Sequence, residues 1–233
     1  MIRPLLALAL LGLPGTAHAA DRSFMLGSFT RVRVDGPFAV SIVTGKSPSA
    51  HASGSIAALD ALTIRADGDT AVVSMGASDW SSDSGQMITP PQVTLTTPTL
   101  SAATLNAGAT VTIDAMKGQK VSLAVNGSGA LSVGSVSADL LDARIVGTGQ
   151  MTLAGAAQRA LVVVSGPGSV AASDLMVNDL TARSDGPGRL DLAARYTATI
   201  STTGLGPVTV AGSPSCTVRA AAGGPVKCGT QTR

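Results

Sequence analysis

The sequence of 233 residues has few aromatic and few charged side chains, at 2% and 13% respectively. The charged fraction is about half of what a typical globular domain carries. Since 45% of the residues are hydrophobic, the composition excludes a disordered chain, which needs much charge and little apolar content. The formal net charge is +2, and Lys and Arg are scattered singly. We therefore expect neither a nucleic acid nor an anionic membrane surface as a partner.

Long hydrophobic runs are absent beyond the N-terminus. The chain begins Met1-Ile2-Arg3, continues with a short apolar stretch, and reaches Ala17-His18-Ala19. A basic start, an apolar stretch and an A-x-A site predict a secretory signal peptide over residues 1–19, cleaved after Ala19. The apolar stretch has about half the length that a bilayer requires, so we expect no membrane insertion. The remaining residues, 20–233, are predicted to form one exported domain in the periplasm, outside the cell or at its surface.

Cysteine is scarce, with only Cys216 and Cys228 in the chain. In an exported protein two cysteines predict a disulfide bond between them. The alternative is a pair of separate buried thiols.

Histidine is scarcer still in the mature chain, where His51 is the sole copy. Its surroundings, Ser47 to Gly54, predict a solvent-exposed loop. A G-x-S-x-G nucleophile motif is absent, and zinc would need three or four ligands. Calcium-binding β-rolls need an aspartate in every turn, but Asp191 has Thr, Ser or Ala at most equivalent positions. The sequence thus predicts no catalytic residue, no metal site and no cofactor.

A triplet of small residues recurs through the second half of the chain. Its copies start at intervals of 20, 20, 19, 20, 18 and 18 residues. They are Ala107-Gly108-Ala109, Gly127-Ser128-Gly129, Gly147-Thr148-Gly149, Gly166-Pro167-Gly168, Gly186-Pro187-Gly188, Gly204-Leu205-Gly206 and Ala222-Gly223-Gly224. Such a period indicates a repeat architecture in which each unit packs against its neighbours.

The residues that follow each triplet alternate in polarity. Two places on are Val111, Leu131, Met151, Val170, Leu190, Val208 and Val226; four places on are Ile113, Val133, Leu153, Ala172, Leu192, Val210 and Cys228. The positions between them are Thr112, Ser132, Thr152, Ala171, Asp191, Thr209 and Lys227. This alternation is typical of a strand with one buried face.

Stacked copies of such a unit would place equivalent residues above one another, about 4.8 Å apart. The pattern therefore predicts an all-β fold, a parallel β-helix or β-solenoid with coils of 18–20 residues and Gly-rich corners over residues 107–228. Clusters such as Gly134-Ser135 and Ala154-Gly155 indicate a second corner in each coil.

Two features of the pattern leave room for other arrangements. An antiparallel meander would use Asn126-Gly127 and Asp185-Gly186 as hairpin turns, although it would not require one residue class at each repeat position. Residues 20–106 form less regular N-terminal strands, in which Gly36-Pro37-Phe38 followed by Val40 and Ile42 again fits the repeat.

Three stretches of the sequence resemble a known family. They are Phe29-x-x-Val32-x-Val34-x-Gly36, Val93-Thr94-Leu95-Thr96-Thr97-Pro98-x-Leu100, and the G-x-G units from Asn126 onward. Together they resemble the GIN domain, a "putative auto-transporter adhesin" head domain of unknown function. Over residues 28–228 the resemblance implies a right-handed β-helix on an exported bacterial protein. It implies no catalytic residue.

The sequence favours a non-catalytic binding, adhesion or structural module of the cell envelope or cell surface. The alternative is a carbohydrate-active enzyme of the lyase or hydrolase type that uses the surface from Asp174 to Arg195. This stretch contains Asp174, Asp179, Asp185 and Asp191, interleaved with Arg183, Arg189 and Arg195. The same residues also suit a strip of alternating charge that keeps the surface soluble.

Candidate ligand residues fall into two groups. The column of Thr112, Ser132, Thr152 and Thr209 could hydrogen-bond a repetitive polymer, although hydroxyl side chains are also ordinary strand surface. Trp80 and Tyr196 are the aromatic residues suited to stack on a sugar ring. The expected partner is an envelope or extracellular polysaccharide or a surface protein.

Overall fold

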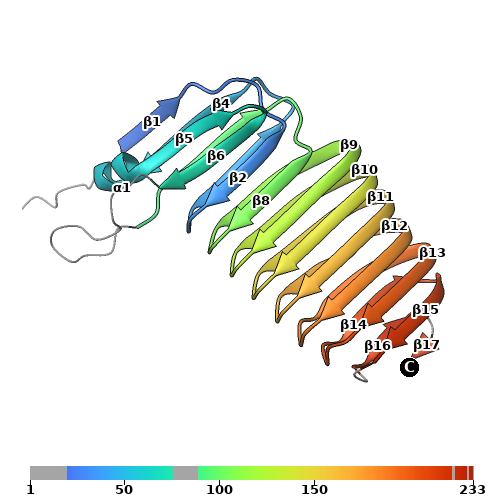
Figure 1. Cartoon of the computed structure of the whole chain (residues 1–233). Helices are drawn as coiled ribbons and strands as arrows, with labels where there is room; N and C mark the ends of the chain where they lie inside the picture. The colour runs from blue at the N-terminus through green and yellow to red at the C-terminus, as the bar shows by residue number, and fades with distance from the viewer. Residues whose placement is uncertain (1–19, 76–88, 222–223, 230, 233) are drawn as a thin grey trace, which may run out of the picture.

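The computed structural model describes residues 20–75, 89–221, 224–229 and 231–232; the predicted signal peptide lies outside them. Within these residues the chain forms a parallel β-solenoid of about 6 turns with one short helix (Figure 1). The predicted all-β solenoid is confirmed. The alternative meander is wrong, because strands on either side of Asn126-Gly127 and of Asp185-Gly186 pair in parallel.

The solenoid contains the following elements. In chain order they are β1 (Ala20–Phe24), β2 (Arg31–Asp35), β3 (Ala39–Thr44), β4 (Ser49–Gly54), α1 (Ile56–Ala61), β5 (Leu62–Asp67), β6 (Thr70–Met75), β7 (Gln92–Thr97), β8 (Ala102–Asn106), β9 (Thr110–Asn126), β10 (Ala130–Val146), β11 (Gln150–Ser165), β12 (Ser169–Asp185), β13 (Leu190–Thr202), β14 (Val208–Gly212), β15 (Ser215–Ala220), β16 (Val226–Cys228) and β17 (Gln231–Thr232).

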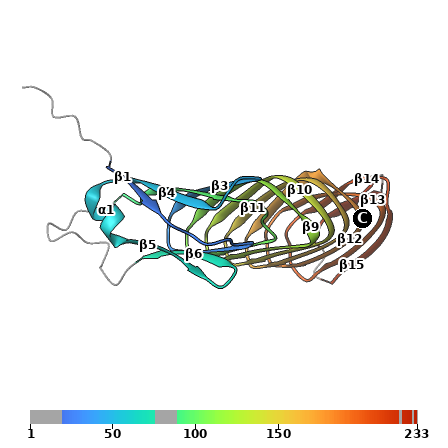
Figure 2. The same cartoon turned by 90° about the horizontal axis from the view of Figure 1, so that it is seen from above.

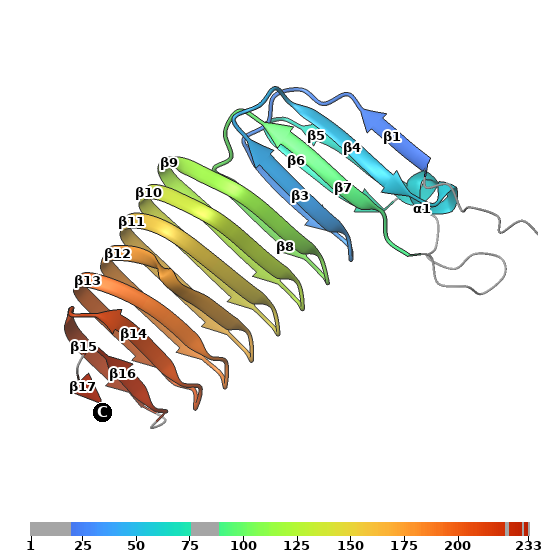
Figure 3. The same cartoon turned by 180° about the vertical axis from the view of Figure 1, so that it is seen from behind.

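The coils build two sheets that face each other across the core. The first sheet, here called the hydroxyl sheet, has the order β1-β4-β7-β3, then the first halves of β9 to β13, then β14, β16 and β17 (Figure 3). The second, here called the arginine sheet, has the order β5-β6-β2-β8, then the second halves of β9 to β13, then β15. Both predicted apolar columns point inward and are buried, and the polar column between them points outward.

The first coil does not follow chain order. Strands β2 and β3 lie between β6 and β7 on one side and β8 and β9 on the other. The connection from β7 to β8 therefore crosses the N-terminal segment, and the buried hydroxyl of Thr97 donates to the carbonyl of Phe29 at 2.6 Å. Beyond this coil, β4 and β5 pair antiparallel with β7 and β6 and close the N-terminal end, with α1 beside them (Figure 2).

One edge of the solenoid turns tightly at the Gly-rich triplets. The first residue takes a positive φ in the five triplets from Ala107 to Gly188, as in Gly147 at +112°, a conformation that a side chain would disfavour. The third residue lies against the coil below, since a Cβ on Gly168 would come within 2.8 Å of the carbonyl oxygen of Gly149. Ala107 holds the equivalent first position at a φ of 69°, which costs about 1 kcal/mol for a residue with a Cβ.

The opposite edge, here called the broad edge, is a continuous bend within β9 to β13. It comprises residues 115–120, 135–140, 154–159, 174–179 and 193–197. The predicted second corner lies at its start, where the register between β10 and β11 shifts after Val133. At this point Gly134 and Ser135 of β10 oppose the single residue Ala154 of β11. Such a β-bulge lets a strand bend without ending it.

A ladder of polar side chains joins the out-of-order coil to its neighbours. Asn106 Nδ2 donates to Asp35 Oδ1 at 2.6 Å, and Asn126 Nδ2 donates to Asn106 Oδ1 at 2.9 Å. Arg33 also pairs with Asp35. Burial by itself would raise the pKa of Asp35, but the hydrogen bonds and charges of these neighbours outweigh it and lower that pKa.

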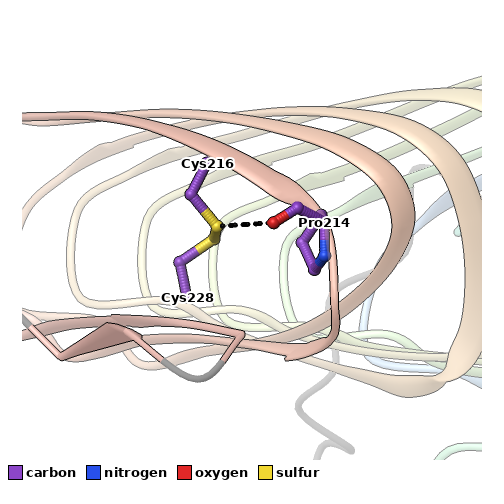
Figure 4. The surroundings of a disulfide bond; sticks show 3 residues. All are labelled: Pro214, Cys216 and Cys228. Carbon is purple, nitrogen blue, oxygen red and sulfur yellow. Dashed lines mark hydrogen bonds between the residues drawn. A yellow bond between two sulfur atoms is a disulfide. The ribbon is translucent and has the colours of Figure 1, made fainter.

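The C-terminal end is closed by a disulfide bond between Cys216 of β15 and Cys228 of β16, as predicted (Figure 4). The bond joins the two sheets across the core, and the Cα atoms of Cys216 and Cys228 are 6.3 Å apart. Facing sheets usually lie about 10 Å apart, so the solenoid is pinched at this end. Beyond β15 no strand of the described chain covers the arginine sheet, and its inward residue Val218 stays half-buried.

We expect reduction of the disulfide to lower the free energy of unfolding by about 3 kcal/mol, because a bond that closes a short loop restricts the unfolded chain. The measurement is a thermal melt with and without reductant, with the double variant Cys216→Ala/Cys228→Ala as a control that should melt like the reduced protein. An equal melting temperature in oxidised and reduced protein would show that the disulfide does not stabilise the C-terminal end of the solenoid.

We expect Asp35→Asn to destabilise the protein by about 1 kcal/mol at neutral pH through weaker charge-assisted hydrogen bonds. Because the folded state lowers the pKa of Asp35, this stabilisation is present above the unfolded pKa of about 3.9 and is lost as the pH falls through the folded pKa. The melting temperatures of wild type and variant should converge at acidic pH. The control is Asp21→Asn, which changes an exposed carboxylate of β1. A difference in melting temperature between wild type and Asp35→Asn that stays constant down to the lowest pH would contradict this role of Asp35.

Candidate functional site

A straight row of outward side chains crosses the hydroxyl sheet from end to end. Each residue is in register with the next, so the row repeats at the strand spacing of about 4.8 Å. In spatial order it contains Ser23, His51, Thr94, Ser41, Thr112, Ser132, Thr152, Ala171, Asp191, Thr209 and Lys227. We call it the hydroxyl row.

The four candidate residues all lie in this row: Thr112, Ser132 and Thr152 are consecutive neighbours, and Thr209 lies three strands beyond Thr152. It also extends the row toward the N-terminal end. Sequence reasoning missed that extension, because the strands that supply it are out of chain order and two of them, β1 and β4, run antiparallel to their neighbours.

The hydroxyl row crosses a shallow hollow in its N-terminal half. This hollow, of about 180 Å³, lies over β7, β3 and β9 and is lined by Thr94, Ser41 and Thr112 together with their neighbours. Among the described residues, the hydroxyls of Thr94, Thr112 and Thr152 have no side-chain partner. They are therefore free to bond a ligand.

His51 occupies a strand, which corrects the predicted loop. It lies in β4 within the hydroxyl row, and its Nδ1 is 3.0 Å from the hydroxyl of Ser23. Its strand carries Ser, Ala and Gly, which suggest a loop in the sequence, but antiparallel pairing with β1 and β7 holds it in the sheet.

The two candidate aromatic residues do not join the hydroxyl row. Tyr196 is 58% exposed at the broad edge, with the guanidinium carbon of Arg195 5.9 Å from its ring centroid. Trp80 lies outside the described residues. The structure thus places the exposed tyrosine on a different side of the coil from the hydroxyl row.

The four aspartates of the alternative enzymatic surface are distributed around the coil. Asp174 and Asp179 lie on the broad edge, and the latter accepts a hydrogen bond from Thr197 at 2.6 Å. Asp185 lies on the arginine sheet and binds Thr203, whereas Asp191 lies on the hydroxyl sheet and pairs with Arg189. The four carboxylates thus lie on three sides of the coil, and none of them lines the hollow of the broad edge.

The described part of the chain contains no group of three or more His, Cys or acidic residues that could hold a metal ion. Each of the five ion pairs found among the residues that the structure describes joins one Arg to one Asp at the surface. Also within those residues, no helix is long and apolar enough to cross a membrane.

A second hollow, of about 390 Å³, lies on the broad edge and extends over β9 to β13. Its polar lining includes Asp139, Gln158, Asn178 and Arg195. Sequence reasoning missed this hollow because its polar residues come from four different coils and share no residue class.

Several solved structures have the same fold as this chain. A structure described as a "putative adhesin" from Bacteroides fragilis has a TM-score of 0.79 at 20% identity and covers 94% of this chain and 97% of that chain. A "putative adhesin" from Parabacteroides distasonis has a TM-score of 0.74 at 17% identity, with 91% and 98% covered. A "putative lipid binding protein" from the same species has a TM-score of 0.65 at 13% identity, with 93% and 98% covered. At these identities the likeness concerns the fold.

A comparison with curated proteins gives no significant match. A comparison with protein families gives one that covers residues 28–214, so the two cysteines lie beyond the matched segment. That segment contains the three stretches that carry the resemblance seen in the sequence. The chain therefore belongs to the family described as "Putative auto-transporter adhesin, head GIN domain".

Proposed function

We propose that this protein is an exported, non-catalytic binding module of the bacterial envelope and that its hydroxyl row binds an extended polysaccharide. The family and the solved structures with the same fold support an adhesin-like binding role. The observation that supports a polysaccharide as the ligand is the hydroxyl row itself. Free hydroxyls at a constant spacing on a flat sheet match a polymer whose own hydroxyl groups recur at regular intervals.

The flat sheet suits binding better than catalysis. Strands paired on both sides hold the row rigid, so a polymer would lose little free energy to reordering of the protein. A hydrolytic site would need two carboxylates close together, and the aspartates of the alternative surface face three different sides of the coil.

Export is supported by the N-terminal sequence pattern and by the disulfide, since such bonds persist in oxidising compartments. We expect the secreted or periplasmic protein to begin at Ala20. Intact-mass measurement of protein purified from cell fractions tests this, with Ala17→Arg/Ala19→Arg as the variant that should block cleavage. Full-length protein retained in the cytoplasm with reduced cysteines would refute export.

The row is tested with Thr94→Val/Thr112→Val/Thr152→Val, which removes three hydroxyls but keeps side-chain shape and strand propensity. We expect retention on insoluble envelope and extracellular polysaccharides to weaken about tenfold or more, because three lost hydrogen bonds at about 0.5–1.5 kcal/mol each amount to at least about 1.5 kcal/mol. The matched control is Thr104→Val/Thr199→Val/Thr217→Val on the arginine sheet, which should bind like wild type.

Release of reducing ends is measured in the same wells. If wild type releases reducing ends and Asp191→Ala does not, the result would favour the alternative carbohydrate-active enzyme. Equal binding by the row variant and its control would refute the row as the binding surface.

A further inference from the structure

The hollow on the broad edge has a floor of small residues and a polar rim. Gly118, Ala138 and Ala157 occupy equivalent positions on three successive coils and form the floor. Asp139 and Gln158 follow two of them along the strand and stand on the rim, where Asn178 Nδ2 donates to Gln158 Oε1 at 2.6 Å. Because the floor lacks bulky side chains, a ligand can lie close to the backbone between these polar groups.

A β-bulge shapes one end of the hollow. Val177 pairs with Ala194 and Asp179 pairs with Thr197, so two residues of β13 oppose the single residue Asn178 of β12. Those two residues are Arg195 and Tyr196, and both are exposed although neighbouring strand residues normally alternate. The bulge therefore presents the guanidinium of Arg195 at the end of the hollow, and the ring of Tyr196 lies next to that guanidinium just outside the lining.

Two titratable groups line the hollow, and they carry opposite charges at separate places. Asp139 is on β10 and Arg195 is on β13, three strand spacings or about 14 Å apart. Neither forms an ion pair with any described residue. A simple anion would satisfy Arg195 but would leave Asp139 without a donor, and a neutral sugar would leave Arg195 without a counterion.

We propose that this hollow binds an acidic saccharide, a segment of a polysaccharide whose sugars carry carboxylates. The guanidinium of Arg195 donates to the sugar carboxylate, which is the bidentate geometry that arginine favours. Sugar hydroxyls donate to Asp139 and exchange hydrogen bonds with the amides of Gln158 and Asn178. Tyr196 stacks on the apolar face of a ring beside Arg195. The volume of about 390 Å³ lies within the range of small-molecule sites.

This proposal deepens the polysaccharide-binding role but concerns a surface separate from the hydroxyl row. The probe is a purified oligogalacturonate, titrated calorimetrically into the mature protein at low salt. Its methyl ester keeps the sugar backbone and removes the charge. We expect the acid to bind and the ester to bind about tenfold more weakly. Added salt should weaken binding of the acid but not binding of the ester.

Two variants test the hollow in different ways. Arg195→Ala removes the cation, and Ala156→Phe places a ring over the floor from an exposed position without changing the charge. Each should weaken binding of the oligogalacturonate about tenfold or more. The matched control is Arg183→Ala, which removes an equally unpaired, exposed arginine from the arginine sheet.

Equal losses of oligogalacturonate affinity in Arg195→Ala and Arg183→Ala would overturn the proposal, because they would show that the ligand responds only to the overall charge of the protein. Unchanged binding in Ala156→Phe would also overturn it, because the ligand would then lie outside the hollow. Absence of binding to the acid would overturn it as well. The triple threonine variant of the hydroxyl row leaves the hollow intact and should bind the oligogalacturonate normally. Failure of one surface can therefore be distinguished from failure of the other.

Discussion

Parallel stacking of the coils at a single strand spacing is the constraint on which this molecule depends. The ladder hydrogen bonds form only when each coil repeats the path of its neighbour, so the tight edge must turn at the same place every time. At that edge successive backbones approach so closely that Gly168 has no space for a Cβ. The narrow interior explains why the regular coils contain no Phe or Trp, whereas Phe29 and Phe38 are buried in and beside the out-of-order coil near the N-terminal end.

A stack of this kind could continue indefinitely unless its ends are closed. At the N-terminal end, antiparallel strands and α1 cover the last coil, and a coil inserted out of chain order fastens that region to the repeats (Figure 1). At the C-terminal end of the described chain, a disulfide between β15 and β16 joins the two sheets. Capping matters because an open sheet edge invites pairing with other chains.

The closed stack offers surfaces of different kinds for binding. The hydroxyl sheet is flat and repetitive, which suits contact with a polymer over a long distance. The broad edge is hollowed where a change of coil length forces a bulge, and that irregularity groups unlike side chains in one place. In a solenoid, then, regular coils create extended surfaces and departures from the repeat create local sites.

The sequence alone determined the fold class, the coil length and the direction in which the repeated side chains point. These follow from periodicity, because a residue class that recurs every 18–20 positions occupies the same place in every coil. The disulfide was predicted on a different ground, the presence of only two cysteines in a chain expected to be exported, and the structure contains it. Only the tertiary structure decided that β2 and β3 enter the stack out of order, that His51 belongs to a strand, and that Arg195 lies in a hollow with Asp139. Those features depend on contacts between segments that share no pattern, and the hydrogen bonds that hold them exist only once the coils have stacked.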